Sequence, residues 1–256
     1  MGRLSVLVLT LNEERNIAAC LDSVRWADEI IVVDSGSTDR TVELARAYTD
    51  KVYQIEWKGY GATRNLALGR TSGDWILWLD ADERVTPELA AEVRDILGRA
   101  ELPESGFQIA RRAYFLGRWI RHCGWYPGRV TRLFRRERGR FTESSVHERL
   151  VLDGAVADTR HDLIHLTDPD LSHYFAKFNR YTSLAAQDLR SEGRRFKLRD
   201  LLGRPLFAFV KMYVLKRGFL DGMQGFILCV LSSAYVFTKY AKLWELERRG
   251  ASTEGD

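Results

Sequence analysis

The sequence predicts an α/β fold, in which helices cover both faces of a mostly parallel sheet, with a helical appendage at the C-terminal end. The first observation is an alternation of apolar, strand-like runs with helical patterns between residues 4 and 98. The second is a change to almost continuous helical periodicity from about Asp170 onward. Hydrophobic residues make up 45% of the 256 residues, which is enough to build a large core. We therefore expect one domain over residues 1–168, built from halves 1–100 and 101–168, followed by a helical region over 169–256.

Four strands are expected in the first half. Three of them are unbroken apolar runs, typical of strands buried on both faces of a parallel sheet, and the third in order alternates in polarity. Helical patterns fill the connections between these strands, and Thr86 is the expected N-cap of a further helix that has Pro87 at its first position. Strands and helices that alternate in this way form parallel sheets. The expected strands are 4–11, 29–34, 51–57 and 75–79, and the expected helices are 12–24, from the turn at 35–39 to Tyr48, a short one within 58–74, and 86–98.

The pattern changes in the second half. Segments 106–117 and 129–136 have strand character and are expected to extend the sheet in antiparallel fashion. Residues 143–151 are expected to form a turn that leads into an edge strand. The appendage then follows as an amphipathic helix over 171–189 and two apolar helices near 205–217 and 220–247.

The strand at 75–79 ends abruptly in Asp80, Asp82 and Glu83. Open α/β sheets bind ligands beyond the carboxyl ends of their strands, so these carboxylates are expected at the ligand-binding edge. Two carboxylates that are two residues apart can approach one cation, and Mg²⁺ or Mn²⁺ prefers such oxygen ligands. The alternative is an acidic turn ahead of a helix whose dipole favours negative charge. The spacing therefore suits metal and phosphate chemistry without requiring it.

Polar side chains also follow the other predicted strands. Carboxylates and amides suit a ribose and a base edge, and arginine suits a diphosphate. Each position has a local alternative, because Asn12 can cap a helix, Asp34 can close a turn and Arg64 can be a surface residue. The residues concerned are Thr10, Asn12 and Glu13 after the first strand, Asp34, Ser35 and Gly36 after the second, and Arg64 and Asn65 after the third.

Two other nucleotide-binding folds are excluded by their motifs. A dinucleotide-binding domain needs G-x-G-x-x-G directly after its first strand, and the loop LTLNEER contains no glycine. The near match GYGATR follows the third strand and lacks the third glycine, and a P-loop motif is absent. The three cysteines, Cys20, Cys123 and Cys229, have neither metal nor redox spacing, which fits a reducing cytosol.

The net charge of +4 is unevenly distributed along the chain. Residues 111–140 hold ten arginines and one acid, and residues 194–217 hold eight Lys or Arg and one acid. Such segments suit phosphorylated ligands, anionic lipid or nucleic acid, or they only keep the protein soluble. Nucleic-acid binding has no support beyond the arginine run, and we expect none.

Four blocks of sequence carry a resemblance to a known family. They cover residues 4–89, and in order and spacing they resemble family-2 glycosyltransferases with the GT-A fold. These blocks are LSVLVLTLNEERNIAACLDSV, EIIVVDSGSTDRTVELA, GYGATRNLAL and GDWILWLDADERVTPEL. Later blocks resemble a narrower group, which contains the bacterial lipopolysaccharide inner-core β-1,4-glucosyltransferases that act on a heptose. These are WYPGRVTRLFRR, SSVHERL, HYFAKFNRYTSLAA and KRGFLDGMQGF.

The resemblance implies a UDP-sugar donor and one divalent cation, Mg²⁺ or Mn²⁺. Asp34, with Thr10 and Glu13, would hold uracil and ribose. Asp80 would contact ribose and metal-bound water, and Asp82 would ligate the metal against the diphosphate. Arg64 would lie near base or phosphate, and Asn12, Ser35, Gly36, Asn65 and Ala81 would complete the nucleotide-sugar site. Apart from the resemblance, Arg132 or Arg135 or both could grip the donor diphosphate or an acceptor phosphate, or they could only fill an edge strand.

An inverting transfer also needs a base that takes the proton of the acceptor hydroxyl. The family places an Asp or Glu on the loop beyond the antiparallel extension, where this chain has Glu148. Glu148 is the expected base, and Glu143 is the runner-up. The family's common Glu-Asp pair is His-Glu here, so His147 could be the base, could orient Glu148 or could only pack. His165 could contact a phosphate or the metal, or it could be structural.

The C-terminal region contains 17 uncharged residues between Asp221 and Lys239. As a helix they would extend roughly 26 Å, which is short for a bilayer core of about 30 Å. An apolar surface with flanking Lys and Arg is typical of an interfacial helix on anionic lipid. A core or dimer-interface helix and a true span are the alternatives. The residues expected to contact lipid are Phe207, Phe209, Met212, Tyr213, Leu215, Phe219 and Phe226, supported by Arg204, Lys211, Lys216 and Arg217.

Together these features predict an inverting, metal-dependent hexosyltransferase. It would move a hexose, with glucose as the first expectation, from a UDP-sugar to a lipopolysaccharide core sugar such as heptose. We expect a cytoplasmic protein, peripheral on the inner face of the cytoplasmic membrane, because the N-terminal residues have strand character and no signal-peptide pattern. The alternatives are transfer to polyprenyl phosphate or another lipid-linked glycan, and a catalytically inactive, membrane-docked module that binds nucleotide sugars.

Overall fold

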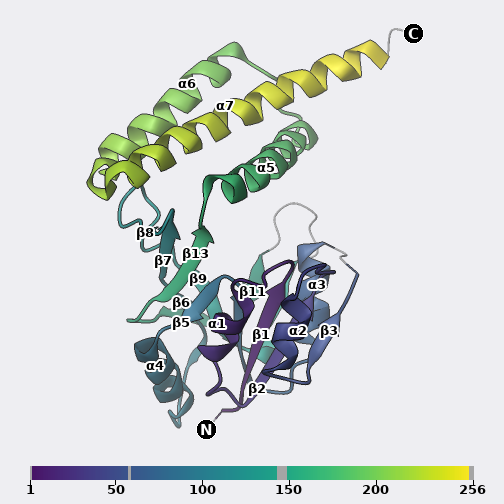
Figure 1. Cartoon of the computed structure of the whole chain (residues 1–256), viewed down its shortest axis with the longest axis vertical. Coiled ribbons are helices and arrows are strands. Elements are labelled where there is room, and N and C mark those ends of the chain that lie inside the picture. Colours follow the sequence, from purple (N-terminus) through teal and green to yellow (C-terminus); the bar gives the residue numbers. More distant parts are fainter. Residues whose placement is uncertain (1, 57–58, 143–148, 254–256) are drawn as a thin grey trace. The chain divides into compact units, whose positions relative to one another are not determined.

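The computed structural model describes residues 2–56, 59–142 and 149–253. The chain forms two compact units, whose elements are labelled in Figure 1. The first unit comprises Met1–Arg112 and Gly128–His165, and the second comprises Ala113–Pro127 and Leu166–Asp256. The sequence-based division at residue 168 differs from this mainly in the segment Ala113–Pro127. This segment belongs to the second unit because its apolar side chains are buried against the C-terminal helices.

A seven-stranded sheet forms the centre of the first unit, with strand order β12-β6-β9-β4-β1-β2-β3. The predicted parallel part is confirmed, since β4, β1, β2 and β3 run parallel. The predicted antiparallel extension is also present, because β9 pairs antiparallel with both β4 and β6. The strands are β1 (Leu4–Thr10), β2 (Glu29–Asp34), β3 (Val52–Gln54), β4 (Trp75–Asp80), β6 (Glu104–Ile109), β9 (Val130–Arg135) and β12 (Ala155–Asp158).

Helices cover both faces of this sheet. On one face Val6 and Val8 of β1 pack with α1 (Ile17–Asp22), α2 (Thr41–Arg46) and α4 (Pro87–Leu97). On the other face, Leu7 lies in a cluster with residues of α3 (Tyr60–Leu68) and of a two-stranded ribbon of β10 (Gly139–Phe141) and β11 (Leu150–Leu152). Thr86 caps α4 as predicted, since its Oγ1 accepts a hydrogen bond of 3.2 Å from Leu89 N.

The predicted strand at 106–117 is two strands instead of one. Its first part is β6, which belongs to the large sheet. Its second part is β7 (Arg111–Phe115), which pairs with β8 (Arg118–Trp119). The chain therefore leaves the large sheet at Ala110, whose carbonyl accepts a hydrogen bond from Leu163 N at the start of β13 (Leu163–Asp168). The first residues of β13 pair with β5 (Glu83–Val85), which follows the acidic end of β4.

The amino end of β2 carries a buried charge. Glu29 is 5% exposed and accepts hydrogen bonds from Lys51 Nζ, Ser5 Oγ and Ser72 N, the last at 2.9 Å. Burial alone would raise the pKa of Glu29, but these hydrogen bonds outweigh it and lower the pKa to about 2. Glu29 is therefore a stabilising ion at neutral pH.

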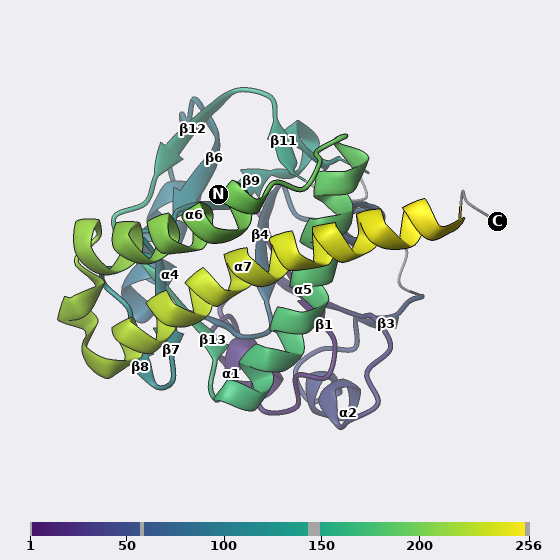
Figure 2. The ribbon, with the colours of Figure 1, turned by 90° about the horizontal axis from the view of Figure 1, so that it is seen from above.

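The second unit is mainly helical. It contains α5 (Leu171–Ser191), α6 (Leu198–Phe209) with its π-helical continuation η2 (Val210–Leu215), the short 3₁₀ helix η3 (Gly218–Asp221) and α7 (Gly222–Thr253). A 3₁₀ turn, η1 (Arg136–Arg138), lies in the first unit. The helix expected near 205–217 thus begins earlier, at Leu198. Figure 2 shows α6 alongside the N-terminal half of α7, and Tyr240 and Leu243 of the C-terminal half are buried with Ala186 of α5.

Candidate functional site

The turn after β4 places three carboxylates close together, and backbone contacts hold it. Glu83 Oε2 accepts a hydrogen bond of 3.0 Å from Asp80 N, and Arg84 Nη1 donates to the carbonyls of Ala81 and Glu83 at 2.9 and 2.8 Å. The side chain of Glu83 is fully buried, whereas those of Asp80 and Asp82 are 37% and 13% exposed. Glu83 therefore supports the turn, and the two aspartates remain available to a ligand.

Arg132 of β9 binds this turn from the neighbouring strand. Its Nη2 donates to Asp80 Oδ2 at 2.6 Å and to Glu83 Oε1 at 2.5 Å, and its side chain is 1% exposed. The guanidinium lies 3.7 Å from the centroid of the Trp78 ring, a cation–π contact. The antiparallel pairing of Leu77 with Leu133 puts Arg132 beside Trp78 and thus at the carboxyl end of β4.

The buried charges of this cluster shift one another's pKa values. Burial would raise the pKa of Asp80, but the charge of Arg132 and its hydrogen bond lower it below the usual range. Burial raises the pKa of Glu83, which is the weaker acid of the two. Burial would lower the pKa of Arg132, but the charges of Glu83 and Asp80 raise it. Asp80 is therefore ionised at neutral pH beside a guanidinium that stays charged.

Two buried nitrogens of Arg132, Nε and Nη1, make no hydrogen bond to any residue that the structure describes. Buried donors are normally satisfied, so these two atoms are candidates for a ligand contact. Thr10 Oγ1 likewise makes no hydrogen bond to a residue that the structure describes, and Thr10 is only 5% exposed. It lies at the end of β1 in register with Asp34, and Leu9 beside it is in register with Asp80.

His165 contacts the second aspartate. Its Nε2 lies 3.3 Å from Asp82 Oδ2, and it is in register with Glu83 across the β5–β13 pair. Burial would lower the pKa of His165, but the hydrogen bond and charge of Asp82 raise it. The sequence left open whether His165 contacts a ligand or is structural, and the structure shows that it is next to the acidic turn.

The loops after β1 and β2 hold each other. Asp34 is fully buried, and its Oδ2 accepts hydrogen bonds from Gly36 N and Ser37 N at 3.1 and 3.0 Å. Ser37 Oγ donates to Asp34 Oδ1 and accepts from Asn12 N at 2.7 Å, and Asn12 Oδ1 accepts from Thr38 N at 2.8 Å. Asp34 therefore does close a turn, one of the alternatives that the sequence left open. Its contact with uracil and ribose stays a prediction, as do those of Ser35 and Gly36.

A chain of side chains joins the β1 loop to the acidic turn. Glu13 Oε2 accepts from Asn16 Nδ2 at 2.8 Å, and Asn16 Oδ1 accepts from Arg84 Nη2 at 3.0 Å. Since Arg84 also holds the carbonyl of Ala81, Glu13 and Ala81 belong to one hydrogen-bonded edge. The predicted role of Glu13 and Ala81 in nucleotide binding is compatible with this placement and is not tested by it.

Helix α3 contributes Arg64 and Asn65 in different ways. The Arg64 guanidinium lies over the rings of Trp78 and Phe141, 4.5 and 5.5 Å from their centroids. Trp78 thus contacts two guanidinium groups, those of Arg64 and Arg132. Asn65 binds the backbone of Phe141 twice, since its Nδ2 donates to the carbonyl at 2.8 Å and its Oδ1 accepts from the N–H at 2.9 Å. Both polar atoms of the Asn65 side chain therefore form hydrogen bonds to β10.

The structure brings most of the predicted residues to one edge of the sheet. Arg64 and Arg132 lie over Trp78, Arg132 binds Asp80, and Asp82 lies beside His165 in the same turn. The loops of Asn12 and Asp34 follow the neighbouring strands. Arg135, named as a possible second phosphate contact, is at the opposite end: it is in register with Trp75 and donates to the carbonyls of Glu104 and Leu102. The antiparallel direction of β9 carries it there. The predicted base Glu148, with Glu143 and His147, lies outside the described residues.

Sequence reasoning missed several residues of this edge. Trp78 was assigned to a buried strand, but its indole supports two arginines. Asn16 and Arg84 carried no signal as single polar residues in a helix and a turn. Glu83 was recognised as part of the acidic run, yet its burial under Arg132 depends on the pairing of β9, which no local pattern reveals.

The chemistry of the acidic turn fits a divalent cation that is bound together with a phosphate. Asp80 and Asp82 offer hard oxygen ligands, and His165 lies beside Asp82. Within the described part of the chain, no three His, Cys, Asp or Glu side chains form a ready-made metal cage. Mg²⁺ commonly uses one or two carboxylates and takes its other ligands from water and substrate phosphates. The donor set thus suits a cation that arrives with a diphosphate.

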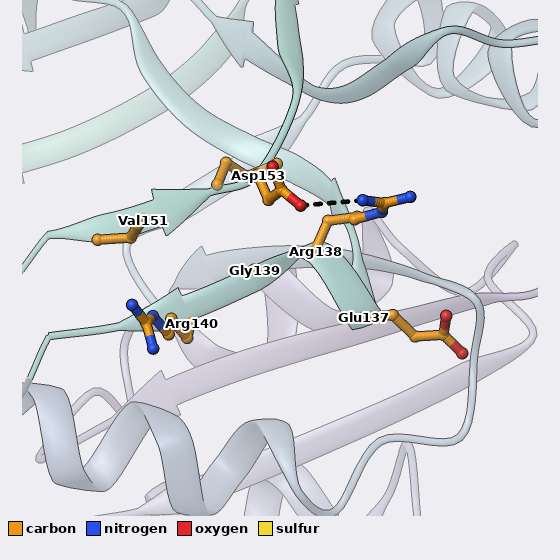
Figure 3. Close-up of a pocket in the computed structure, with 7 residues that line it drawn as sticks. Glu137, Arg138, Gly139, Arg140, Val151 and Asp153 are labelled. Atoms are coloured by element: carbon orange, nitrogen blue, oxygen red, sulfur yellow. Dashed lines mark hydrogen bonds and ion pairs between the residues drawn. The ribbon is translucent and has the colours of Figure 1, made fainter.

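Two cavities of the first unit lie away from this edge. One, of about 380 Å³, lies at η1 and the β10–β11 ribbon and is lined by Glu137, Arg138, Gly139, Arg140, Val151, Leu152 and Asp153. Figure 3 shows the exposed ion pair of Arg138 and Asp153 beside it, with an N–O distance of 2.9 Å. The other, of about 870 Å³, includes Asp74 and Trp75 at the amino end of β4. Neither contains Asp80 or Asp82, so neither cavity belongs to the candidate site at the carboxyl edge.

The residues of this edge lie in a part of the chain that matches a known protein family. The profile of Glycosyl transferase family 2 matches residues 5–150. Over its length the chain is similar to the lipopolysaccharide core biosynthesis glycosyltransferase LpsC of Rhizobium meliloti (strain 1021), with 32% identity over 94% of this chain and 92% of that protein. It is 29% identical to the uncharacterized glycosyltransferase RT0209 of Rickettsia typhi (strain ATCC VR-144 / Wilmington), over 96% of this chain and 88% of that one.

A solved structure shares the fold. It is that of the mannosyltransferase PcManGT from Pyrobaculum calidifontis in complex with GDP-Man and Mn²⁺. Its TM-score is 0.56 and its sequence identity is 18%, over 94% of this chain and 87% of that one.

Proposed function

The chain belongs to glycosyl transferase family 2, and we propose that it moves a hexose, glucose in the first instance, from a UDP-sugar to a sugar of the lipopolysaccharide core. The observation that carries this proposal is the paired Asp80 and Asp82 at the end of β4, with Arg132 bound beside them. Similarity to a lipopolysaccharide core glycosyltransferase over 94% of the chain supports the acceptor class. A heptose of the core is the acceptor that the sequence blocks favour.

Asp82 and Asp80 would hold a Mg²⁺ or Mn²⁺ ion, which supplies Lewis-acid stabilisation of the charge on the departing nucleoside diphosphate. The protein that shares the fold was solved with GDP-Man and Mn²⁺, which supports a cation of this kind. Arg132 keeps Asp80 ionised and donates its hydrogen bond to the Oδ2 atom of that carboxylate. The buried Nε and Nη1 donors of Arg132 would bind a phosphate oxygen.

Glu148 would take the proton from the acceptor hydroxyl. The hydroxyl oxygen would attack the anomeric carbon of the donor sugar at the same time, while the bond between that carbon and UDP breaks. The described residues on either side of that segment are held in place. Arg149 N donates to Thr142 Oγ1 at 2.9 Å, and Thr142 N donates to the Arg149 carbonyl at 3.0 Å. One residue earlier, Asn65 fixes the backbone of Phe141. The segment that carries Glu148 therefore starts and ends at fixed points of the first unit.

We further propose that the protein works at the cytoplasmic face of the inner membrane as a peripheral protein. A lipid-linked acceptor sugar is presented at such a surface, and the second unit carries exposed apolar and basic residues. Among the described residues, the helix over Gly218–Arg249 is long and apolar enough to cross a membrane by length and composition. Length and composition alone do not distinguish a span from a packed helix.

The test is transfer of glucose from UDP-glucose to purified core acceptor, with and without Mn²⁺ or Mg²⁺. Asp82→Asn should remove most of the metal-dependent turnover and leave the fold intact, because one carboxylate faces the diphosphate-bound cation. Asp153→Asn is the matched control, since Asp153 is an exposed carboxylate of the same unit paired with Arg138. Near-normal turnover of Asp82→Asn at saturating donor would refute the metal role. Mass spectrometry of the core from cells without the protein should show the loss of one hexose.

A further inference from the structure

A row of large apolar side chains is exposed along α6 and η2. Leu198, Leu202 and Leu206 are 62%, 61% and 66% exposed, and Val210 and Val214 continue the row with 39% and 53%. These five residues are spaced by four, so they lie on one face of the helical segment. Isolated apolar residues on a surface need no explanation, but a continuous face of this kind marks an interaction site.

A second group of exposed apolar residues lies close to this row in the chain. One member, Phe207, lies within α6, and the others lie at the end of η2, in η3 and at the start of α7, where Phe219 and Phe226 contact the ring of Tyr213. All of its members are at least 42% exposed. They are Phe207, Leu215, Phe219, Leu220, Met223 and Phe226, with exposed fractions of 63%, 67%, 49%, 49%, 67% and 42%.

Positive charge surrounds the row of five. Residues 194–217 hold eight Lys or Arg and a single acid, Asp200, which is paired with Arg204 at 2.8 Å. Lys211, Lys216 and Arg217 are exposed. A partner whose surface is apolar and negatively charged is complementary to this combination, and an anionic bilayer has both properties.

The opposite side of α6 and η2 is already packed. Phe209 and Tyr213 stack with ring centroids 5.2 Å apart, and with Met212 they pack against the buried cluster of Leu228 and Cys229. Ser233 Oγ of α7 donates to the Pro205 carbonyl at 2.9 Å. Phe209, Met212 and Tyr213, which the sequence assigned to lipid, therefore serve the core of the unit.

Helix α7 makes protein contacts at several points along its length, although only 22% of its 18-residue apolar window is buried. Leu228 and Cys229 are buried near its start, and Tyr240 and Leu243 are buried near its end. Lys242 Nζ lies within hydrogen-bonding distance, 2.8 to 2.9 Å, of four oxygens of α5, which belong to Asn179, Thr182 and Ser183. A transmembrane α7 would have to give up these contacts and place Lys242 in or near the hydrocarbon, which is costly.

We infer that the second unit binds an anionic lipid surface with α6 and η2 lying in the plane of the membrane, and that α7 is a packed helix rather than a span. The row Leu198–Val214 enters the boundary between headgroups and acyl chains, and Lys211, Lys216 and Arg217 contact anionic headgroups. This rests on the proposed function, since a lipid-linked acceptor requires a membrane, but it makes a separate statement about which face docks.

The test uses the full-length protein and sedimentation with vesicles of phosphatidylcholine, with and without phosphatidylglycerol. Leu202→Asp combined with Leu206→Asp should lower partitioning into both kinds of vesicle at least about tenfold, because two exposed apolar contacts are lost. Lys211→Glu combined with Lys216→Glu should lower binding to anionic vesicles on the order of a hundredfold and leave weak binding to neutral vesicles unchanged. High salt should have the same effect as the charge reversal.

Leu184→Asp is the matched control, because Leu184 is a 41% exposed leucine on α5 of the same unit. It should bind vesicles as the unmodified protein does, and an equal loss would show that the docking face is wrong. All variants should keep their circular dichroism and their hydrolysis of UDP-glucose in solution, so a failure of the donor chemistry is distinguishable from a failure of docking. Retention in the membrane at alkaline pH would establish a span. Conversion of a dimer to a monomer by the leucine pair, without vesicle binding, would assign the face to a second copy.

Discussion

Replacing Arg132 by methionine tests the charge cluster that underlies the site. Methionine has a similar length and is apolar, so it keeps the contact with Trp78 and removes the guanidinium. Glu83, which is fully buried, then loses its counter-ion, and Asp80 loses a hydrogen bond of 2.6 Å. Removing one partner of a buried ion pair costs about 3–5 kcal/mol, because the remaining charge stays uncompensated. The 37% exposure of the Asp80 side chain places the expected loss near the lower end, at about 3 kcal/mol.

The assay is urea unfolding followed by tryptophan fluorescence, with hydrogen exchange on peptides from β4 and β9 to locate the loss in the first unit. Adding Glu83→Gln to Arg132→Met should recover roughly half of the lost free energy, since the uncompensated charge is then gone. Arg138→Met is the control for the chemical change. Arg138 pairs with Asp153 at the surface, where both side chains are more than half exposed, so its removal should cost less than about 1 kcal/mol.

Two results would refute this reasoning. One is a cost for Arg132→Met no larger than that for Arg138→Met. The other is strict additivity of Arg132→Met and Glu83→Gln, which would mean that the two side chains do not interact energetically.

Three further predictions concern the catalytic segment and the amino end of the sheet. Asn65→Ala should lower kcat with little change in the Kd for UDP-glucose, because it releases the backbone of Phe141 ahead of the segment that carries the proposed base; an equal loss of donor affinity would assign Asn65 to the donor instead. Glu148→Gln should reduce turnover by about 10²–10⁴ and spare donor binding, and the same loss from Glu143→Gln alone would move the role of the base to Glu143. The lowered pKa of Glu29, about 2 against 4.5 when unfolded, contributes about 3 kcal/mol above pH 4.5, which is lost as the pH falls toward 2; Glu29→Gln should flatten that part of the pH–stability curve, and an unchanged slope would contradict the shift.

The parallel strands and their acidic end could be predicted from sequence for a physical reason. A central parallel strand is covered on both faces, so it needs an unbroken apolar run, and the run must end where the chain meets solvent and ligand. Trp75 to Leu79 shows this directly, and the carboxylates that follow mark the edge. The Thr86 cap could be predicted as well, because capping depends on neighbouring residues only.

The partners of Arg132 and Asn65 could not be predicted in this way, because each depends on contacts between distant segments. Arg132 reaches Asp80 across 52 positions of sequence, and Asn65 reaches Phe141 across 76. The order and direction of β9 in the sheet decide both which arginine is near the acidic turn and which is far from it. Sequence reasoning treated Arg132 and Arg135 alike. The antiparallel register places Arg132 at the carboxyl end of β4 and Arg135 at its amino end.

The division between units shows the same limit. Residues 113–127 follow a strand of the first unit, yet Phe115, Ile120 and Cys123 are buried in the cluster that contains Leu228 and Cys229. Apolar patterns report that a side chain is buried but do not name the surface that buries it. For that reason the sequence analysis assigned Phe209 to the lipid and did not name Leu202, although Phe209 packs inside the second unit and Leu202 is 61% exposed.

Arg132 also shows why local rules fail at this edge in particular. Along β9, Val130, Arg132 and Phe134 alternate with the residues of the other face, so a core position is occupied by a charged side chain. Replacing Arg132 and its buried partner Glu83 together by apolar residues would avoid the cost of desolvating both charges, so stability alone does not account for the buried ion pair. The charge instead keeps Asp80 ionised and leaves two buried donors beside it. Sequences depart from the rule of apolar cores where function requires it, and the departure on β9 coincides with the carboxylates at the end of β4. The position of the site follows from this placement. The buried arginine of β9 and the carboxylates that follow β4 are each unfavourable alone, and they stabilise each other at this edge of the sheet.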